Sequence, residues 1–328
     1  MLKKINLEIR PHRSGDESEI VELWKEVFNK KRSVEHWQWR FNKCPFGKGI
    51  VMLALDGDKI ISFYSTNRMD IKVKQEIVKA VHGFDGATHP DYRKQGIFTL
   101  ILKKLTKDYT EEGVKFMYGY PNTNSYQIHL KYFSWTGHGL IELWVKDLKK
   151  KDNGAGVRNN GKIQQVNVFD DRVNQLWNRA KNNLKVGIVR NKDYLNWRYV
   201  ENPSIKYHKV YYLDANDVLS GFVVLKIHIQ DDTVIGHIID ILASNEIAFN
   251  ELIQYSYKFF NEKDVSLLSC WFPKNHSFSK FLTNEGFALD IMDHTCFGVK
   301  SISNIAKIKE YVEKKDNWYM TMGDCDIF

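Results

Sequence analysis

Cysteine and proline are scarce in this chain, with four Cys and six Pro among 328 residues. The cysteines, Cys44, Cys270, Cys296 and Cys325, are scattered, without a CxxC pair or a Cys/His group at zinc-site spacing. This pattern excludes a small disulfide-stabilised fold and predicts no metal site. It also favours a reducing, cytoplasmic location.

Long apolar runs are missing as well. The N-terminal residues 1–9 have no apolar core of signal-peptide length, and no later run is long enough to cross a bilayer, so we expect no membrane insertion. The formal net charge of +8 is mild for this length, and no aromatic-basic recognition motif accompanies it. We therefore expect no nucleic-acid partner and favour a small polyanionic ligand, such as a phosphorylated cofactor.

The length suggests two domains of ordinary size, and the sequence repeats itself. Four short anchors recur in the same order in the two halves, separated by slightly changing offsets, which indicates a duplicated domain with small insertions. The anchors pair residues 39–45 with 197–203, 23–24 with 176–177, 120–122 with 272–274, and 134–135 with 286–287.

The join between the halves is a polar stretch. Residues 149–162 are rich in Gly and Asn and have no hydrophobic periodicity, so they are predicted to be a linker. The first domain then covers residues 1–148 and the second residues 163–328. We predict an α/β (α+β mixed-sheet) fold for both, each a mixed, mostly antiparallel sheet flanked by helices.

Hydrophobic periodicity gives the element order of the first half as β-α-β-β-β-α-β-α. A turn signal at 56–58 joins the second and third strands as a hairpin. The expected strands are 5–9, 50–55, 59–65, 80–88 and 114–120, and the expected helices are 20–28, 97–110 and 124–133.

The most informative segment is the turn at residues 89–99, between an apolar strand and a helix. Gly96 lets the backbone approach a ligand closely, and Arg93 and Lys94 add positive charge. The free N–H groups and the positive end of the following helix face the same turn. The turn therefore predicts a site for a phosphate-bearing ligand.

Together, these features resemble the GNAT superfamily of acyl-CoA N-acyltransferases. The family signature [Gln/Arg]-x-x-Gly-x-[Gly/Ala] is matched by Arg93 to Phe98, with Phe98 standing where Gly or Ala is commonest. The resemblance covers about residues 5–145 directly and 163–300 through the repeat. In outline the chain looks like the tandem two-domain GNAT proteins.

The resemblance implies an acyl-CoA co-substrate, most simply acetyl-CoA. In the family, a backbone N–H of the strand holds the thioester oxygen, which maps to Ala87 and Thr88, and the residue that maps to Asn124 lies near the pantetheine. The implied cofactor-binding residues are Ala87, Thr88, Arg93, Lys94, Gln95, Gly96, Ile97, Phe98, Thr99 and Asn124.

Candidate proton-transfer groups lie on both sides of the turn. Asp85 is the first choice for a general base because burial in an apolar strand raises a carboxylate's pKa, and its alternative role is an ion pair with an arginine. His82 and His89 are weaker bases. Tyr126 and Tyr132 are candidate acids, with core packing as their alternative role.

The fourth helix departs from the family pattern in two places. Leu130 falls where the family places its usual acid, a tyrosine, and Ser134 replaces the glycine that follows. The resemblance therefore supplies no general acid at the family's usual position. In one branch of the family a terminal carboxylate enters the site, and the corresponding residue here is Phe328.

The second half lacks the turn. Its corresponding strand, 236–243, runs directly into a helix at 247–260, with no Arg-x-x-Gly and with Glu246 near the helix start, where a negative charge opposes an anion. We therefore expect one acyl-CoA site, in the first domain, and a degenerate second domain.

The leading functional hypothesis is an N-acyltransferase, most simply an N-acetyltransferase, that acylates a primary amine of a small molecule such as an amino sugar. One alternative is a non-catalytic CoA-binding or scaffold protein. The other is a Fem-like aminoacyl transferase that uses charged tRNA, which needs no pyrophosphate turn.

Overall fold

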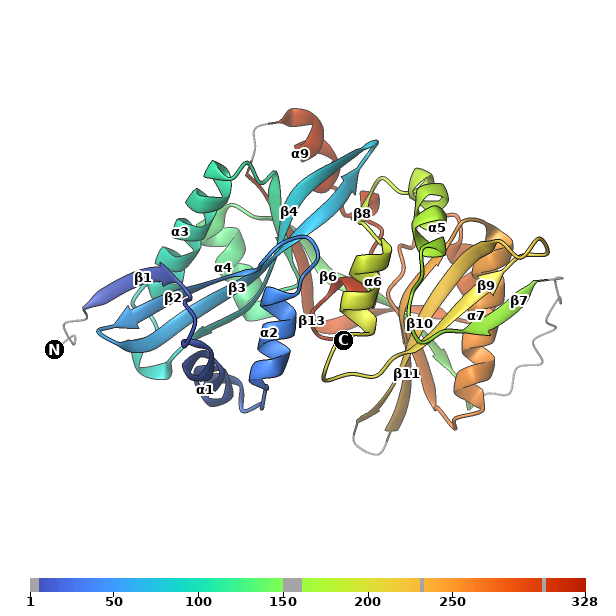
Figure 1. The fold of residues 1–328 in the computed structure, drawn as a ribbon, viewed down its shortest axis with the longest axis horizontal. Helices are drawn as coiled ribbons and strands as arrows, with labels where there is room; N and C mark the ends of the chain where they lie inside the picture. The colour runs from blue at the N-terminus through green and yellow to red at the C-terminus, as the bar shows by residue number, and fades with distance from the viewer. Residues whose placement is uncertain (1–5, 150–160, 231–232, 303–304) are drawn as a thin grey trace. The chain divides into compact units, whose positions relative to one another are not determined.

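The computed structural model describes residues 6–149, 161–230, 233–302 and 305–328. Most of the predicted linker 149–162, and the first residue of the strand predicted at 5–9, lie outside these ranges. The chain forms two compact units, neither of which is continuous in sequence (Figure 1). Unit 1 comprises Met1–Ile71, Ile77–Gly139 and Cys296–Glu313, and unit 2 comprises Lys72–Glu76, Leu140–Thr295 and Lys314–Phe328.

Unit 1 contains a mixed sheet in the order β1-β2-β3-β4-β5-β13. β4 and β5 are parallel, and β13 runs antiparallel to β5, with Gly298 opposite Gly119. The strands are β1 (Leu7–Pro11), β2 (Ile50–Asp56), β3 (Lys59–Val73), β4 (Glu76–Thr88), β5 (Phe116–Gly119) and β13 (Ala288–Ser301).

Helices cover both faces of this sheet. One core cluster joins the sheet to α3 (Ile97–Glu111) and α4 (Thr123–Phe133), and a second joins the opposite face to α1 (Glu17–Phe28) and α2 (Val34–Asn42). The element order predicted for the first half omitted α2. This helix starts at Ser33, whose hydroxyl accepts a hydrogen bond from the His36 N–H.

Unit 2 contains a sheet in the order β6-β12-β11-β10-β9-β7. β11 and β12 are parallel, and β6 runs antiparallel to β12, with Trp144 opposite Cys270. The strands are β6 (Thr136–Asp147), β7 (Lys162–Gln165), β9 (His208–Leu213), β10 (Leu219–Gln230), β11 (Thr233–Ala243) and β12 (Leu267–Cys270).

The remaining elements are short connections and flanking helices. A three-residue strand, β8 (Val186–Ile188), pairs with β3, whose last two residues belong to unit 2. The other helices are α5 (Arg172–Ala180), α6 (Lys192–Tyr199), α7 (Glu246–Asn261) and α8 (Ser279–Asn284), with α9 (Ala306–Val312) belonging to unit 1.

The two sheets share one strand order. In each, a parallel pair is followed by an antiparallel sixth strand that comes from the other half of the sequence: β13 completes unit 1 and β6 completes unit 2. The predicted mixed α/β class is confirmed. The shared order supports the predicted duplication, which remains a prediction.

Candidate functional site

The turn between β4 and α3 is open at the start of the helix. The His89 side chain accepts a hydrogen bond from the Asp91 N–H and starts a short 3₁₀ turn, after which Lys94 (φ 62°) and Gly96 (φ 76°) adopt the left-handed region. No atom lies within 4 Å of the position of a Cβ at Gly96. Glycine therefore relieves backbone strain here and leaves the surface clear.

The first turn of α3 presents N–H groups without partners in the described part of the chain. The first helical hydrogen bond runs from Leu100 to the Gly96 carbonyl, and no side chain caps the helix. The first turn contains no acidic residue. Because unsatisfied N–H groups and the helix dipole favour negative charge, this turn is suited to bind an anion.

The predicted cofactor residues of the turn divide by exposure. Arg93 is exposed, and its Nε donates to the carbonyl of Thr88 at 3.1 Å, which holds the guanidinium at the end of β4. Lys94, Gln95 and Gly96 are also exposed, whereas Ile97 is buried and Phe98 and Thr99 are half-buried.

The corresponding helix start in unit 2 is closed. The Asn245 side chain accepts a hydrogen bond from the Ala248 N–H at 2.9 Å, and Glu246, the first residue of α7, forms an ion pair with Lys280 at 2.8 Å. A capped helix start that carries a carboxylate does not favour an anion.

β4 and β5 separate beside the turn. Their parallel pairing runs from Ala80 and Phe116 to Gly83 and Gly119, where β5 ends. β4 continues to Thr88 through Asp85, which adopts a left-handed conformation (φ 47°). The backbone of residues 86–88 therefore lies beyond the last residue pair of the two strands.

Ala87 and Thr88, the predicted thioester-binding positions, are held from β3. The Ser62 hydroxyl donates to the Ala87 carbonyl at 2.8 Å and lies 2.8 Å from the Thr88 hydroxyl. These contacts fix the end of β4 next to the turn. The amide groups of residues 87 and 88 belong to the part of β4 that borders the opening between β4 and β5.

Phe98, the departure from the signature, has a matching glycine. A Cβ at Gly86 would lie 2.7 Å from the Phe98 ring and 2.8 Å from the Tyr64 ring. Glycine at 86 therefore makes room for an aromatic ring at 98. The rings of Phe98 and Tyr64 meet edge to face, with centroids 5.6 Å apart.

Sequence reasoning missed a tyrosine–histidine pair at this opening. The Tyr64 ring lies along Gly83 and Gly86, and its hydroxyl is 3.5 Å from His129 Nε2. His129 Nδ1 lies 2.7 Å from the Ser125 carbonyl, and burial lowers the pKa of the imidazole. His129 is thus neutral near pH 7, with Nδ1 donating its proton to that carbonyl. No spacing pattern singles out these two residues, since they come from β3 and α4.

Asp85 is held by an arginine, which was the alternative role considered for it. It forms an ion pair with Arg32, whose guanidinium lies 3.8 Å from the centre of the Trp24 ring. In unit 2, Asp240 pairs in the same way with Arg190, the residue that precedes the N-cap of α6. Arg32 likewise lies just before α2, at the residue preceding its N-cap.

The two weaker base candidates also have structural contacts. The His82 ring stacks on Tyr118, with centroids 5.0 Å apart. His89 places Nε2 3.1 Å from Glu26 while Nδ1 accepts from the backbone.

The predicted residues of α4 are dispersed. Tyr126 is buried and its hydroxyl accepts a hydrogen bond from the Gly139 N–H at 2.8 Å. Tyr132 is 55% exposed. Asn124 is exposed in the first helical turn, and the residue that caps the helix is Asn122, which accepts from the Ser125 N–H.

Two general features of the described residues bear on the site. Their helices include none that is both long and apolar enough to cross a membrane. Within the same ranges, no cluster of three or more His, Cys, Asp or Glu side chains is arranged to hold a metal ion.

Comparison with known proteins gives a family match for part of the chain. The Acetyltransferase (GNAT) domain family matches residues 8–136, the stretch that carries the turn. A comparison with curated protein sequences gave no match.

Solved structures share the fold over nearly the whole chain. A conserved Enterococcus faecalis protein of unknown function, described as a probable N-acyltransferase, is 13% identical (TM-score 0.74, 93% of this chain and 75% of that one). A GCN5-related N-acetyltransferase from Anabaena variabilis is 10% identical (TM-score 0.72, 92% and 74%). Saccharomyces cerevisiae N-myristoyltransferase with bound myristoyl-CoA is also 10% identical (TM-score 0.61, 92% and 80%).

At such identities the solved structures show the fold alone, whereas the family match concerns the sequence of unit 1 and includes the turn. Residues 8–136 of this chain therefore match the GNAT acetyltransferase domain family in sequence, and the chain shares its fold with solved GCN5-related N-acetyltransferases.

Proposed function

We propose that this chain is an acyl-CoA-dependent N-acyltransferase, most simply an N-acetyltransferase, with its acyl-CoA site in unit 1. The acceptor is a primary amine on a small molecule such as an amino sugar. The observation that carries this proposal is the uncapped start of α3 at Gly96, beside the point where β4 and β5 separate.

In this proposal, the CoA diphosphate binds the N–H groups of residues 95–99, and Arg93 and Lys94 supply countercharge. The pantetheine follows residues 86–88, where β4 has backbone beyond its last pair with β5. The amide of Ala87 or Thr88 then donates to the thioester oxygen, as the family resemblance implies.

The reaction forms a bond between the acceptor nitrogen and the acyl carbon and breaks the bond between that carbon and sulfur. The attacking amine must lose a proton, and the CoA thiolate must gain one. The arginine partner of Asp85 supports a positioning role for that carboxylate. For protonation of the thiolate, Tyr64 is the better candidate, because its ring contacts Gly83 and Gly86 at the strand opening whereas Tyr132 is 55% exposed.

Isothermal titration of CoA and acetyl-CoA tests the proposed site. A variant combining Arg93→Ala with Gly96→Glu adds a carboxylate at the helix start, so we expect binding to be lost while the protein stays folded. Gly113→Glu is the matched control because Gly113 (φ 75°) lies past the C-terminal end of α3 in equally open space. Failure of the unaltered protein to bind either ligand at millimolar concentration would contradict the proposal.

An acceptor panel of amino sugars, aminoglycosides and polyamines tests turnover. Acetylation of any of these amines supports the enzyme. Binding of acetyl-CoA with no turnover supports the scaffold alternative, and transfer that depends on charged tRNA without any response to CoA supports the Fem-like alternative.

A further inference from the structure

Unit 2 contains a cavity of about 260 Å³ that the proposed acyl transfer does not use. Its floor is a row of residues across three strands: Lys226 on β10 lies opposite His237 on β11, which lies opposite Ser269 on β12. His228 and Ile235 form the next row of the same floor.

The polar floor carries basic side chains that no Asp or Glu of the lining balances. Within the described part of the chain, no acidic side chain forms an ion pair with Lys226 or His228, and the terminal carboxylate of Phe328 is bound by Arg198 instead. The His237 Nδ1 lies 2.8 Å from the Ser269 hydroxyl, and the rings of His228 and His237 are 6.1 Å apart. Such a floor attracts an anion and offers it hydrogen-bond donors.

The opposite wall is formed by the Phe328 ring, and this residue is firmly held. Its terminal carboxylate accepts hydrogen bonds from Arg198 Nη2 at 2.8 Å and from the Tyr207 hydroxyl at 3.0 Å, and the arginine balances its charge. The Phe328 ring meets the His237 and Trp271 rings edge to face, each at a centroid distance of 5.4 Å. Because its position is fixed by the backbone and by two rings, this wall keeps the cavity open.

The cavity corresponds to a difference between the units. In unit 1 the register of the parallel strands places His82 opposite Tyr118, and the tyrosine ring stacks on the imidazole. In unit 2 the same register places Ser269 opposite His237. A serine in place of the stacking tyrosine leaves unfilled space above the histidine.

We propose that this cavity binds a small organic acid, with its carboxylate at Lys226 and His228 and its apolar body against Phe328. A volume of about 260 Å³ is near the lower end of the range of small-molecule sites, so the ligand is compact. The apolar wall excludes a simple inorganic anion as the full occupant, since such an ion would leave that wall without a partner. The proposal does not depend on acyl transfer by unit 1.

The test measures the binding of small acids to the full chain by titration calorimetry and by ligand-observed NMR. The probes are phenylacetate and hexanoate, with phenylacetamide, hexanamide and inorganic phosphate for comparison. We expect the two acids to bind with submillimolar Kd and the neutral amides to bind at least tenfold more weakly. Equal binding of acids and amides, or binding of phosphate alone, overturns the assignment of an organic acid.

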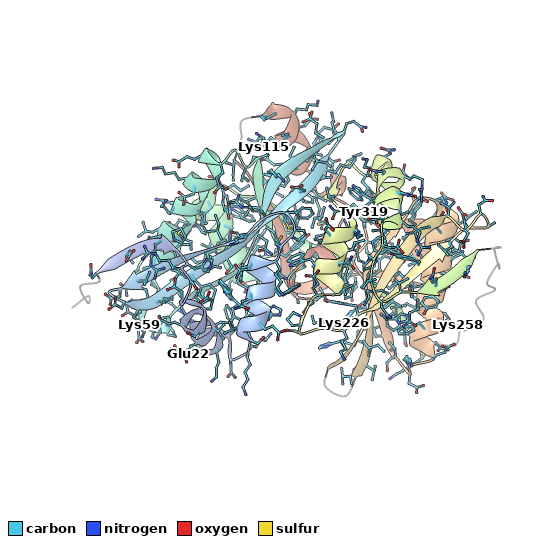
Figure 2. The ribbon with its side chains drawn as sticks, viewed as in Figure 1. Glu22, Lys59, Lys115, Lys226, Lys258 and Tyr319 are labelled. Carbon is cyan, nitrogen blue, oxygen red and sulfur yellow. The ribbon has the colours of Figure 1, made fainter. Side chains whose placement is uncertain are left out.

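Variants locate the site. The double variant Lys226→Gln/His228→Gln should weaken acid binding at least tenfold. Lys258→Gln removes the same charge from an exposed lysine on α7 and should leave binding unchanged (Figure 2 labels Lys226 and Lys258). Unchanged affinity in the double variant overturns the site.

A second variant tests the shape of the cavity without changing its charge. Ser269→Tyr restores the side chain that unit 1 carries at this register, and it should block the acids. If this variant unfolds, Ser269→Val serves the same purpose with less added volume. Full acid affinity in a folded variant at position 269 overturns the proposal, whatever the result with acetyl-CoA.

Discussion

Removing the guanidinium of Arg190 should strongly destabilise unit 2. This side chain is 0% exposed and is paired with Asp240 at 3.0 Å and with Asp324 at 2.8 Å. It also donates to the Thr321 hydroxyl at 3.0 Å. The substitution Arg190→Met keeps much of the side-chain volume but leaves two buried carboxylates without their cation.

The expected cost follows from what remains. Breaking a buried ion pair by removing one partner costs about 3–5 kcal/mol because the other charge stays buried. Tyr199 and Thr321 still donate to Asp240, at 2.8 and 3.1 Å, so some compensation survives. We therefore expect a loss of about 3–4 kcal/mol at pH 7, a large fraction of the stability of an ordinary domain.

The loss should shrink in acid. In the unaltered protein, burial raises the pKa of Asp324 to about 6, and Arg190 opposes this rise. Without Arg190 the folded-state pKa rises further above its unfolded value of about 4. At a pH above the raised pKa, the ionised carboxylate destabilises the folded state. This destabilisation disappears as the pH falls towards about 4, where the carboxyl group is protonated in both the folded and the unfolded state.

Urea denaturation monitored by tryptophan fluorescence at pH 7 and pH 4.5 measures both effects. Arg172→Met is the control because Arg172 and Asp170 are 39% and 44% exposed, and this pair should contribute less than about 1 kcal/mol. A loss below about 1 kcal/mol for Arg190→Met at pH 7, or a loss that grows in acid, would refute the reasoning.

Three further outcomes follow from local geometry. Gly86→Ala should lower the unfolding free energy, measured by urea denaturation, by about 1–3 kcal/mol, because the new methyl group is overpacked against Phe98. Adding Phe98→Leu should recover part of this loss, and strictly additive losses in the double variant would contradict the reasoning. Burial lowers the pKa of His276 to about 4 in the folded protein, whereas the unfolded chain takes up this proton near pH 6.5, so the unfolding free energy should fall between pH 6.5 and 4. His276→Gln should reduce this fall, and an unchanged pH profile of the unfolding free energy would argue against it. Asn122→Ala should cost about 1 kcal/mol by unfolding free energy and Asn124→Ala less than about 0.5, and the reverse order would show that Asn124 is the cap.

The fold could be predicted where periodicity was strong. The strands that became β2 and β4 and the helix that became α3 were expected nearly in place, because each buries a regular apolar stripe. α2 was missed because it is a short helix that buries residues on more than one side, and its start depends on the Ser33 cap. The sixth strand of each sheet could not be predicted, because the pairing of β13 with β5 joins residues distant in sequence.

The candidate site divides in the same way. The turn at residues 93–99 is a local motif, so its shape, including the glycine at φ 76°, could be read from neighbouring residues. Tyr64 and His129 come from different elements and meet only through packing around Gly83 and Gly86, so no local pattern marks them. The arginine partner of Asp85 was anticipated as a class, but its identity required the structure.

The two units share one strand order but differ at positions that bear on ligand binding. Both hold a carboxylate of the fourth sheet strand with an arginine that precedes a helix: Arg32 holds Asp85 and Arg190 holds Asp240. Unit 2 lacks the turn but keeps this arginine–carboxylate pair, so the pair is explained by a structural role. This argues against proton transfer by Asp85. The features that differ are the helix starts at Gly96 and Asn245. If function follows the differences, binding of the CoA diphosphate belongs to the open helix start of unit 1.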